Sequence, residues 1–133
     1  MAKKEYKTSR DLPIYKKTKE LVKETAIAMN HFTRDYKHTL GQQIFNEALM
    51  QLSRLDDADA NFEKRDILLK EFINHQHSIE ELIKLGVELG ALDERYYIAV
   101  IPLLTNIEKQ AFGWYGVTTT GQSSETPSEE CIQ

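Results

Sequence analysis

Cysteine, proline and glycine are scarce in this chain of 133 residues, which contains one, three and six of them respectively. The single cysteine, Cys131, cannot form a disulfide within the chain, and this favours a reducing compartment. No stretch comes near the ~20 consecutive apolar residues of a membrane-spanning helix, and no apolar segment follows the basic start MAKKEYKTSR. We therefore expect a cytoplasmic protein that is not associated with a membrane.

Net positive charge is confined to the front third of the chain. The net charge is −4, yet residues 1–40 carry a net +5, residues 41–116 a net −6 and residues 117–133 a net −3. The overall acidity therefore says little about what the basic front third contacts.

The alternation of apolar and polar residues that is typical of strands is nearly absent, whereas apolar residues recur every three or four positions. This pattern predicts an all-α protein with four helices joined by short connections, and such a protein folds as an up-down antiparallel four-helix bundle. We expect the bundle to span residues 11–116, between a basic N-terminal arm (1–10) and a flexible acidic tail (117–133). The helices should run from Asp11–Pro13 to a joint at Thr33–His38, from about Thr39 to Ala58, from about Phe62 to Leu89, and onward from Asp93.

Residues with special backbone preferences predict where these helices begin and end. Asp11 is suited to cap the first helix and Pro13 to stand in its first turn, while Asp93 is suited to cap the last helix. Gly90 is a natural stop for the third helix. Pro102 should kink the last helix, with a break into two short helices as the alternative.

The third predicted helix has two apolar faces, so we expect it to contact two neighbours. We assign one neighbour to its own bundle and the other to a second subunit. The first face comprises Leu69, Phe72, Ile73, Gln76, Ile79, Ile83 and Gly86, and the second comprises Leu68, His75, Leu82, Leu85 and Leu89.

Two patterns that suggest metal binding are incomplete. Residues 57–63 begin like a calcium loop, but Phe62 and Leu68 stand where that loop needs a glycine and a bidentate glutamate. His75 and His77 are two residues apart on a helix and therefore point to different sides. We expect a capped turn at residues 57–63, and neither a metal nor another cofactor.

Arg34 and His38 resemble the Arg–His pair of some small helical ribonucleases, but that pair lies within a helix and this one is placed at a joint. The chain also lacks a Ser/His/Asp set and a glycine-rich phosphate loop. We expect no catalytic residues.

The basic residues of the front third are candidates for a nucleic-acid-binding surface. Tyr15 and Tyr36 lie among them, and surfaces that mix basic and aromatic residues bind phosphate backbones with salt-dependent affinity. The alternative is an ordinary solvated helix face. The candidate residues are Lys16, Lys17, Lys19, Lys23, Arg34, Lys37 and His38.

Three segments of the chain carry a resemblance to a known family: DLPIYKKTKELV, FTRDYKHTLGQQI and EKQAFGWYG. Over about residues 11–116 the sequence resembles the small four-helix-bundle accessory variability determinant (Avd) proteins of diversity-generating retroelements. It is also similar, to a lesser degree, to the related proteins encoded in intervening sequences of bacterial 23S ribosomal RNA genes. The basic joint that leads into Thr39-Leu40-Gly41 fits the Avd group better.

The resemblance implies a ring-like homopentamer of four-helix bundles with no enzymatic activity. It further implies binding to the retroelement reverse transcriptase and to a structured template RNA or RNA/DNA hybrid, in support of mutagenic cDNA synthesis. Arg34, Lys37 and His38 fall at the basic joint of the family, and Trp114 falls at its Gly-Trp pair, which we interpret as a packing residue. The chain departs from the family in being acidic overall, so a protein-interaction module without a nucleic-acid role is the alternative.

Overall fold

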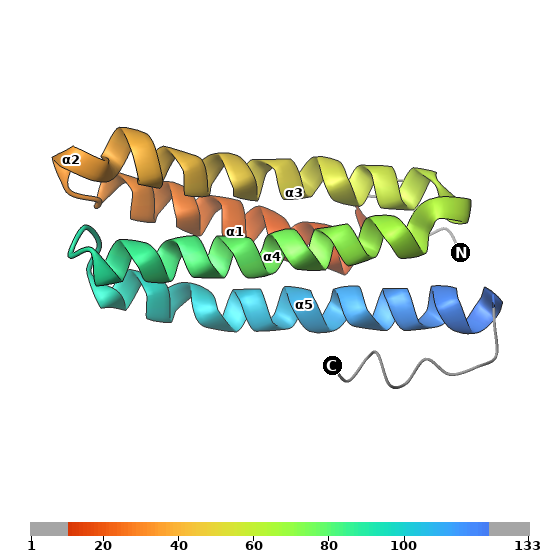
Figure 1. Ribbon diagram of the computed structural model, residues 1–133. Coiled ribbons are helices and arrows are strands. Elements are labelled where there is room, and N and C mark those ends of the chain that lie inside the picture. Colours follow the sequence, from red (N-terminus) through yellow and green to blue (C-terminus); the bar gives the residue numbers. More distant parts are fainter. Residues whose placement is uncertain (1–10, 123–133) are drawn as a thin grey trace.

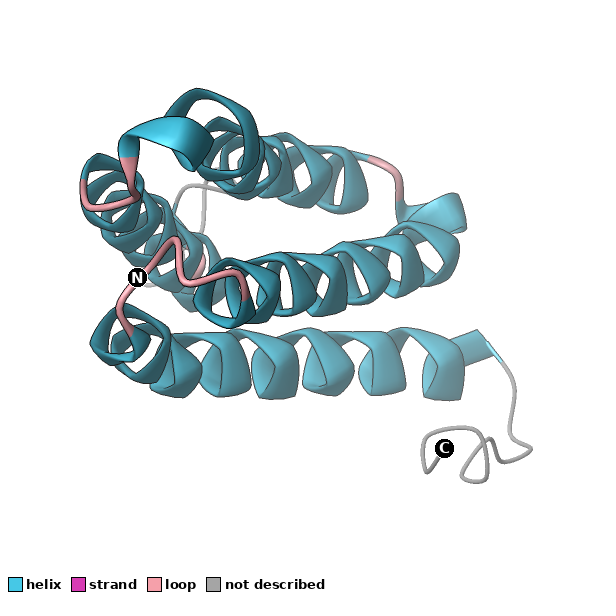
Figure 2. Cartoon of the chain, turned by 60° about the vertical axis from the view of Figure 1, so that its left-hand side comes forward, coloured by secondary structure: helices cyan, strands magenta, loops and turns pink. Residues whose placement is uncertain are grey.

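The computed structural model describes residues 11–122, and the side chains of residues 11–116 (Figures 1 and 2). Four long helices lie side by side, and the described residues contain no strand, so the predicted all-α helical bundle is confirmed. The long helices are α1 (Pro13–Asn30), α3 (Gln42–Ala60), α4 (Arg65–Glu88) and α5 (Glu94–Gln122). Three short helical segments join them: α2 (Arg34–Tyr36), the π-helix η2 (Lys37–Gly41) and the 3-10 helix η3 (Phe62–Lys64).

Each long helix packs against two others: α1 and α4 both contact α3 and α5. The connection from α1 to α3 and the turn from α4 to α5 lie at the same end of the bundle, and η3 lies at the opposite end (Figure 1). We call the first of these the joint end. All four long helices contribute fully buried side chains, among them Leu21, Ile44, Phe72 and Ile107. Burying a side chain of this size stabilises the fold by about 1.5–3 kcal/mol.

The first apolar face predicted for residues 62–89 is confirmed residue by residue, because its seven members are the buried residues of α4. The turn that ends α4 is also as predicted. Gly90 has a φ of 73°, which favours glycine, and its N–H donates to the carbonyl of Val87 at 3.0 Å. The N–H of Ala91 donates to the carbonyl of Gly86 at 2.9 Å, which completes a Schellman motif.

The helix starts confirm two of the three predictions. Pro13 stands in the first turn of α1, and the Asp93 carboxylate accepts a hydrogen bond from the backbone N–H of Arg95 at 2.9 Å, as a cap of α5 should. The predicted position of the cap of α1 is off by one residue. Leu12 occupies the N-cap position of α1, and its carbonyl accepts the N–H groups of Tyr15 and Lys16 at 3.0 and 3.2 Å.

Several predicted boundaries are also corrected. The joint is helical, because α2 and η2 begin at Arg34 and lead directly into α3, which ends at Ala60. The helix predicted from Phe62 begins with the 3-10 turn η3. Helix α5 runs unbroken through Pro102 and ends six residues after Gly116, inside the segment predicted as a tail. The predicted arm at 1–10 and the rest of the predicted tail, including Cys131, lie outside the described residues.

Candidate functional site at the joint end

The joint is held by backbone hydrogen bonds to both of its neighbours. The N–H of Thr33 donates to the carbonyl of Ala91 at 2.9 Å, which ties the joint to the turn between α4 and α5. The Thr33 carbonyl in turn accepts the N–H groups of Tyr36 and Lys37 at 3.0 and 2.9 Å and starts α2. The joint is thus a fixed part of the bundle end.

Packing against Phe32 fixes the joint from inside. Phe32 is 5% exposed and belongs to the core. A Cβ atom on Gly41 would lie 3.2 Å from Cδ1 of Phe32 and from Cγ of Met29, which is tighter than ordinary contact. Gly41 therefore lets η2 approach the end of α1 closely, and this is the physical reason for the glycine that the Thr39-Leu40-Gly41 segment contains.

The π-helix η2 contains two of the three predicted site residues in the joint. The N–H of Gln42 donates to the carbonyl of Lys37, five residues earlier, which is the hydrogen bond that defines a π-turn. Such turns are rare and frequently found at functional sites. Arg34 and His38 are exposed and Lys37 is half-buried, so the joint gathers three basic side chains at one end of the bundle, with Asp35 among them.

The predicted site residues on α1 form a separate group. Lys16, Lys19 and Lys23 are exposed, while Lys17 is half-buried and its Nζ lies 3.5 Å from the carboxylate of Glu20. Lys23 is seven residues before the end of α1 at Asn30, or about 10 Å along the helix axis. The structure therefore brings Arg34, Lys37 and His38 together in the joint and leaves the four α1 lysines outside it.

The two tyrosines predicted among the basic residues are placed differently from expectation. Tyr15 is 6% exposed and belongs to the core, so it cannot take part in a basic–aromatic surface. Tyr36 is half-buried and packs against the core. The predicted aromatic contribution of Tyr15 is wrong, because its position on α1 faces the bundle interior between Ile14 and Thr18.

A stack of three planar side chains at the joint end was missed by the sequence prediction. The rings of His31 and Tyr96 lie 4.8 Å apart between centroids with an interplanar angle of 24°. The guanidinium carbon of Arg95 lies 5.0 Å from the centroid of Tyr96, and an Arg95 Nη2 donates to Tyr96 Oη at 3.2 Å. We call this the His31–Tyr96–Arg95 stack. In the up-down bundle that the sequence predicts, the end of the first helix and the start of the last lie at the same end, and this prediction was the signal that could have found the stack.

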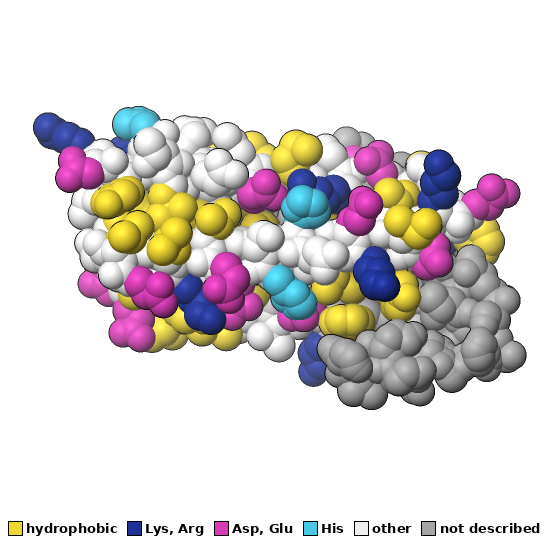
Figure 3. All heavy atoms as spheres, in the orientation of Figure 1, with side chains coloured by type: hydrophobic (Ala, Val, Ile, Leu, Met, Phe, Trp, Pro, Cys, Tyr) yellow, Lys and Arg dark blue, Asp and Glu magenta, His cyan; other side chains and the backbone are white. Residues whose placement is uncertain are grey.

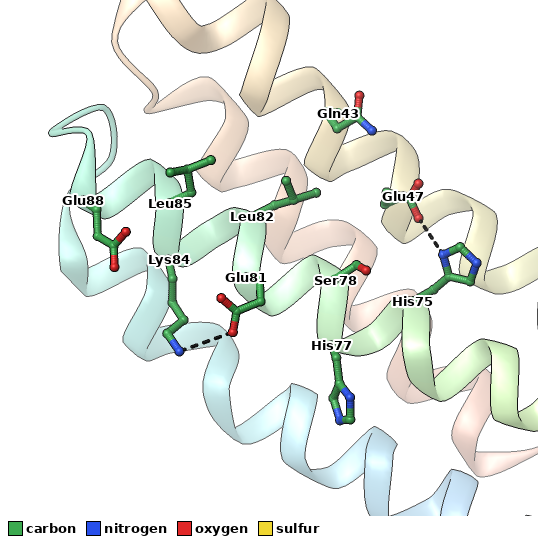
Figure 4. A pocket seen from close by; sticks show the side chains of 10 residues that line it. All are labelled: Gln43, Glu47, His75, His77, Ser78, Glu81, Leu82, Lys84, Leu85 and Glu88. Carbon is green, nitrogen blue, oxygen red and sulfur yellow. Dashed lines mark hydrogen bonds and ion pairs between the residues drawn. The ribbon is translucent and has the colours of Figure 1, made fainter.

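A groove runs along the boundary between α3 and α4 (Figures 3 and 4). Its larger part has a volume of about 650 Å³, and Leu82 and Leu85 of α4 face Gln43 and Glu47 of α3 across it. Toward the joint it continues into a hollow lined by Tyr36, Thr39, Leu40, Gln43, Leu85 and Leu89. We call the whole the α3–α4 groove.

Apolar side chains of the second predicted face of α4 are only partly covered in this groove. Leu85 is 41% exposed and Leu89 46% exposed, while Leu82 is half-buried. Figure 3 shows apolar side chains gathered on this part of the surface, beside a row of charged ones. The charged rim comprises Glu47, Glu81, Lys84 and Glu88, with His75 and His77 farther along.

Neighbouring carboxylates shift the pKa values of two side chains in and near the rim. The carboxylate of Glu81 lies 3.5 Å from Nζ of Lys84 and is the main cause that raises the pKa of Lys84 above its usual value. Nearby, burial raises the pKa of Tyr97, and the carboxylate of Glu80, to which Tyr97 Oη donates at 3.3 Å, raises it further. The rim is acidic on balance.

The metal and turn predictions can be compared with the geometry. His75 lies 3.4 Å from Glu47 of α3, whereas His77 contacts Glu108 of α5, so the two histidines point to different sides as predicted. Residues 57–63 end α3 and form η3, and the Asn61 side chain donates to the carbonyl of Asp57 at 2.9 Å, which confirms a capped turn there. Across residues 11–122 no three His, Cys, Asp or Glu side chains group closely enough to hold a metal ion.

Within the described part of the chain, every helix is too short or too polar to cross a membrane. No protein-family model matches the chain, and comparison with curated proteins and with solved structures gave no match either.

Proposed function

We propose that this protein is a non-catalytic accessory protein of a diversity-generating retroelement, which binds the reverse transcriptase and the template RNA and supports mutagenic cDNA synthesis. In this proposal the helices form an up-down antiparallel bundle, and the bundles assemble into a homopentameric ring. The resemblance of the three sequence segments to Avd proteins supports the proposal. The all-helical fold is consistent with it.

The observation that carries the nucleic-acid part is the joint itself. Arg34, Lys37 and His38 lie within five residues on a helical turn that hydrogen bonds and close packing hold in place. Basic side chains in a fixed arrangement neutralise phosphates, and the counterions that this releases make the affinity depend on salt. We assign RNA backbone contact to the joint first and to the α1 lysines second.

The salt dependence of RNA binding tests this assignment. Two variants separate the groups: Arg34→Gln with Lys37→Gln for the joint, and Lys16→Gln with Lys19→Gln for α1. Each lost phosphate contact should lower the slope of log affinity against log salt by about 0.7 for a single-stranded RNA. Lys64→Gln with Lys70→Gln is the matched control, since it removes two exposed charges from η3 and α4. An unchanged slope in the joint variant would remove the joint from the RNA interface.

The α3–α4 groove supports self-association. Leu85 and Leu89 are exposed apolar side chains on one helix face, and a second copy of the chain that covers them removes this area from water. Leu85→Gln with Leu89→Gln should convert the assembly to monomers in native mass spectrometry. Ile67→Gln with Ile98→Gln is the control, because these residues are even more exposed and lie outside the groove. Loss of assembly in both variants, or in neither, argues against the groove as the contact.

A second candidate is a protein-interaction bundle without a nucleic-acid role. The pairing of Lys17 with Glu20, and the half-buried Glu24 nearby, favour it because they dilute the positive face of α1. Co-purification from native cells distinguishes the candidates. A reverse transcriptase with one structured RNA supports the retroelement role, ribosomal RNA supports the relatives from intervening sequences, and protein partners without RNA support the second candidate.

A further inference from the structure

The His31–Tyr96–Arg95 stack combines features that the joint alone does not have. Its three members are planar and come from the end of α1 and the start of α5. The centroid of the Tyr96 ring lies 4.8 Å from the centroid of the His31 ring and 5.0 Å from the guanidinium carbon of Arg95. Tyr96, which both of the others contact, is half-buried and packs on the core, whereas His31 and Arg95 are exposed. The stack therefore has a fixed central ring and two accessible planar side chains.

Further contacts orient the two exposed members of the stack. His31 Nδ1 lies 3.0 Å from the carbonyl of Ile27, one helical turn earlier, and this contact orients the imidazole. The guanidinium of Arg95 is held by its hydrogen bond to Tyr96 Oη. Both outer groups are thus oriented before any ligand arrives, which lowers the entropy cost of binding a flat partner.

Flat heterocycles are the partners that such planes take. Unpaired nucleobases stack on histidine rings, tyrosine rings and arginine guanidinium planes, and each stacked base raises affinity about 5- to 150-fold. Phosphate contact is available beside the stack, because the N–H of Thr33 binds the carbonyl of Ala91 and so joins the start of the basic joint to the turn before α5. On that turn the carboxylate of Asp93 accepts a hydrogen bond from the N–H of Arg95 as a helix cap.

We propose that the His31–Tyr96–Arg95 stack receives an unpaired base of an RNA whose backbone lies along the basic joint, so that the joint end selects single strands over duplexes. The inference rests on the proposed nucleic-acid role and adds the form of RNA that is bound. A duplex keeps its bases stacked on one another, so it offers only phosphates to this end of the molecule.

Fluorescence anisotropy with two labelled RNAs tests the proposal: a 12-nucleotide mixed-sequence single strand and the duplex of the same sequence. We expect the unmodified protein to bind the single strand more tightly. His31→Leu and Tyr96→Leu should weaken single-strand binding about 5- to 150-fold and leave duplex binding unchanged. His77→Leu is the matched control, since it makes the same change as His31→Leu at an exposed histidine of α4 away from the joint end, and it should bind like the unmodified protein.

A second readout is specific to stacking. A 2-aminopurine placed in the single strand loses fluorescence when it stacks, and this quenching should disappear in His31→Leu, which changes an exposed side chain and is tolerated by the fold even where Tyr96→Leu is not. Arg95→Lys keeps the charge but loses the plane, so it should weaken single-strand binding without changing the salt slope.

The outcomes separate the two proposals. A protein that binds neither RNA overturns both the nucleic-acid role and the stack. A protein that binds both RNAs, with salt dependence, while the stack variants weaken neither or weaken both equally, overturns the stack alone.

Discussion

The ring of Phe32 packs against Gly86 so closely that a Cβ atom on this glycine would lie 3.0 Å from both Cε2 and Cζ of the ring. This is tighter than nine in ten real Cβ contacts, so either the ring or helix α4 would have to shift by a few tenths of an ångström. Gly86 thereby sets how near α4 comes to the segment that leaves α1.

Replacing Gly86 with alanine should therefore destabilise the protein, although alanine is the better helix former. Overpacking of a core costs about 1–3 kcal/mol, whereas the gain in helix propensity is about 1 kcal/mol. We expect Gly86→Ala to lower the free energy of unfolding by about 1 kcal/mol in urea denaturation. Gly113→Ala is the control, because nothing lies within 4 Å of its position on α5, and it should stabilise by about 0.5–1 kcal/mol. Equal stabilisation by both substitutions would show that the Phe32 contact is easily relieved.

Arg65 joins three elements at the end opposite the joint. Its Nε and Nη2 donate to the carbonyls of Ala58 and Asp59 at 2.9 Å each, and its guanidinium lies over the rings of Phe62 and Trp114 at 5.2 and 5.1 Å. Lysine keeps the charge but has neither the fork nor the plane. We expect Arg65→Lys to lower the free energy of unfolding by about 1–2 kcal/mol.

The only tryptophan of the chain is Trp114, so its fluorescence reports directly on this contact. Its emission should shift in Arg65→Lys before any unfolding occurs. Lys64→Ala, on the exposed neighbouring residue, should change stability by less than ~0.5 kcal/mol and leave the emission as it is. An Arg65→Lys variant with the same stability and emission as this control would show that the Arg65 contacts do not stabilise the fold.

A buried amide pair joins α3 to α4. Gln51 Nε2 donates to Gln76 Oε1 at 2.6 Å and to the carbonyl of Phe72 at 3.0 Å, and Arg54 donates to Gln51 Oε1 at 2.9 Å. Gln76 Nε2 is buried and finds no hydrogen-bond partner among the described residues. A buried donor left without a partner costs about 1–3 kcal/mol.

A double-mutant cycle of Gln51→Leu and Gln76→Leu measures the pair. Gln51→Leu should be the more destabilising single change, since it deprives the buried Gln76 Oε1 of its donor and Arg54 of one of its two acceptors. Gln76→Leu should cost less, since it also removes the unsatisfied donor. The double variant should be more stable than the sum of the single effects predicts, with a coupling of about 0.5–3 kcal/mol. Thermal denaturation measures the three free-energy changes. If those of the two single variants add up to that of the double variant, the two residues are not coupled.

Tyr97 should titrate above the ordinary tyrosine pKa of about 10. Burial is the main cause, with Glu80 second, so Glu80→Gln should bring the pKa of Tyr97 only part of the way back. The folded state holds this proton more tightly than the unfolded state does. The stability that Tyr97 contributes is therefore complete below pH ~10 and is lost as the pH rises through the folded-state pKa.

NMR of protein labelled at tyrosine Cζ measures this directly, with Tyr97→Phe to assign the resonance. A Tyr97 resonance that titrates at or below pH ~10 would contradict the stated cause. The same experiment in Glu80→Gln shows how much of the increase in the pKa of Tyr97 comes from the Glu80 carboxylate.

The sequence pattern predicted the parts of the fold that depend on burial along one helix. The seven residues of the inner face of α4 were correct because a spacing of three or four residues places side chains on one side of a helix whatever its neighbours are. Gly90 was correct because only glycine takes a φ of 73° without strain.

The missed features depend on contacts between segments distant in sequence. The π-turn in the joint is favoured by packing of Gly41 against Phe32, and no local propensity indicates it. His31 and Tyr96 are 65 positions apart, so their stack can be found only after the helices are arranged. For the same reason, Tyr15 was assigned to the surface by its basic neighbours, although its place on α1 faces the core.

The π-turn at Lys37–Gly41 has a consequence for how this sequence tolerates insertions and deletions. A π-turn contains one residue more than the α-helical turn it replaces, so deleting one residue there would give an uninterrupted α-helix from α2 into α3. Everything before the deletion would then rotate by about 100° around the helix axis relative to α3. Arg34 would point in a new direction, and Phe32 could no longer pack against both Gly41 and Gly86. The length of this one turn, as much as the identity of its side chains, sets the direction in which the basic end of the molecule faces.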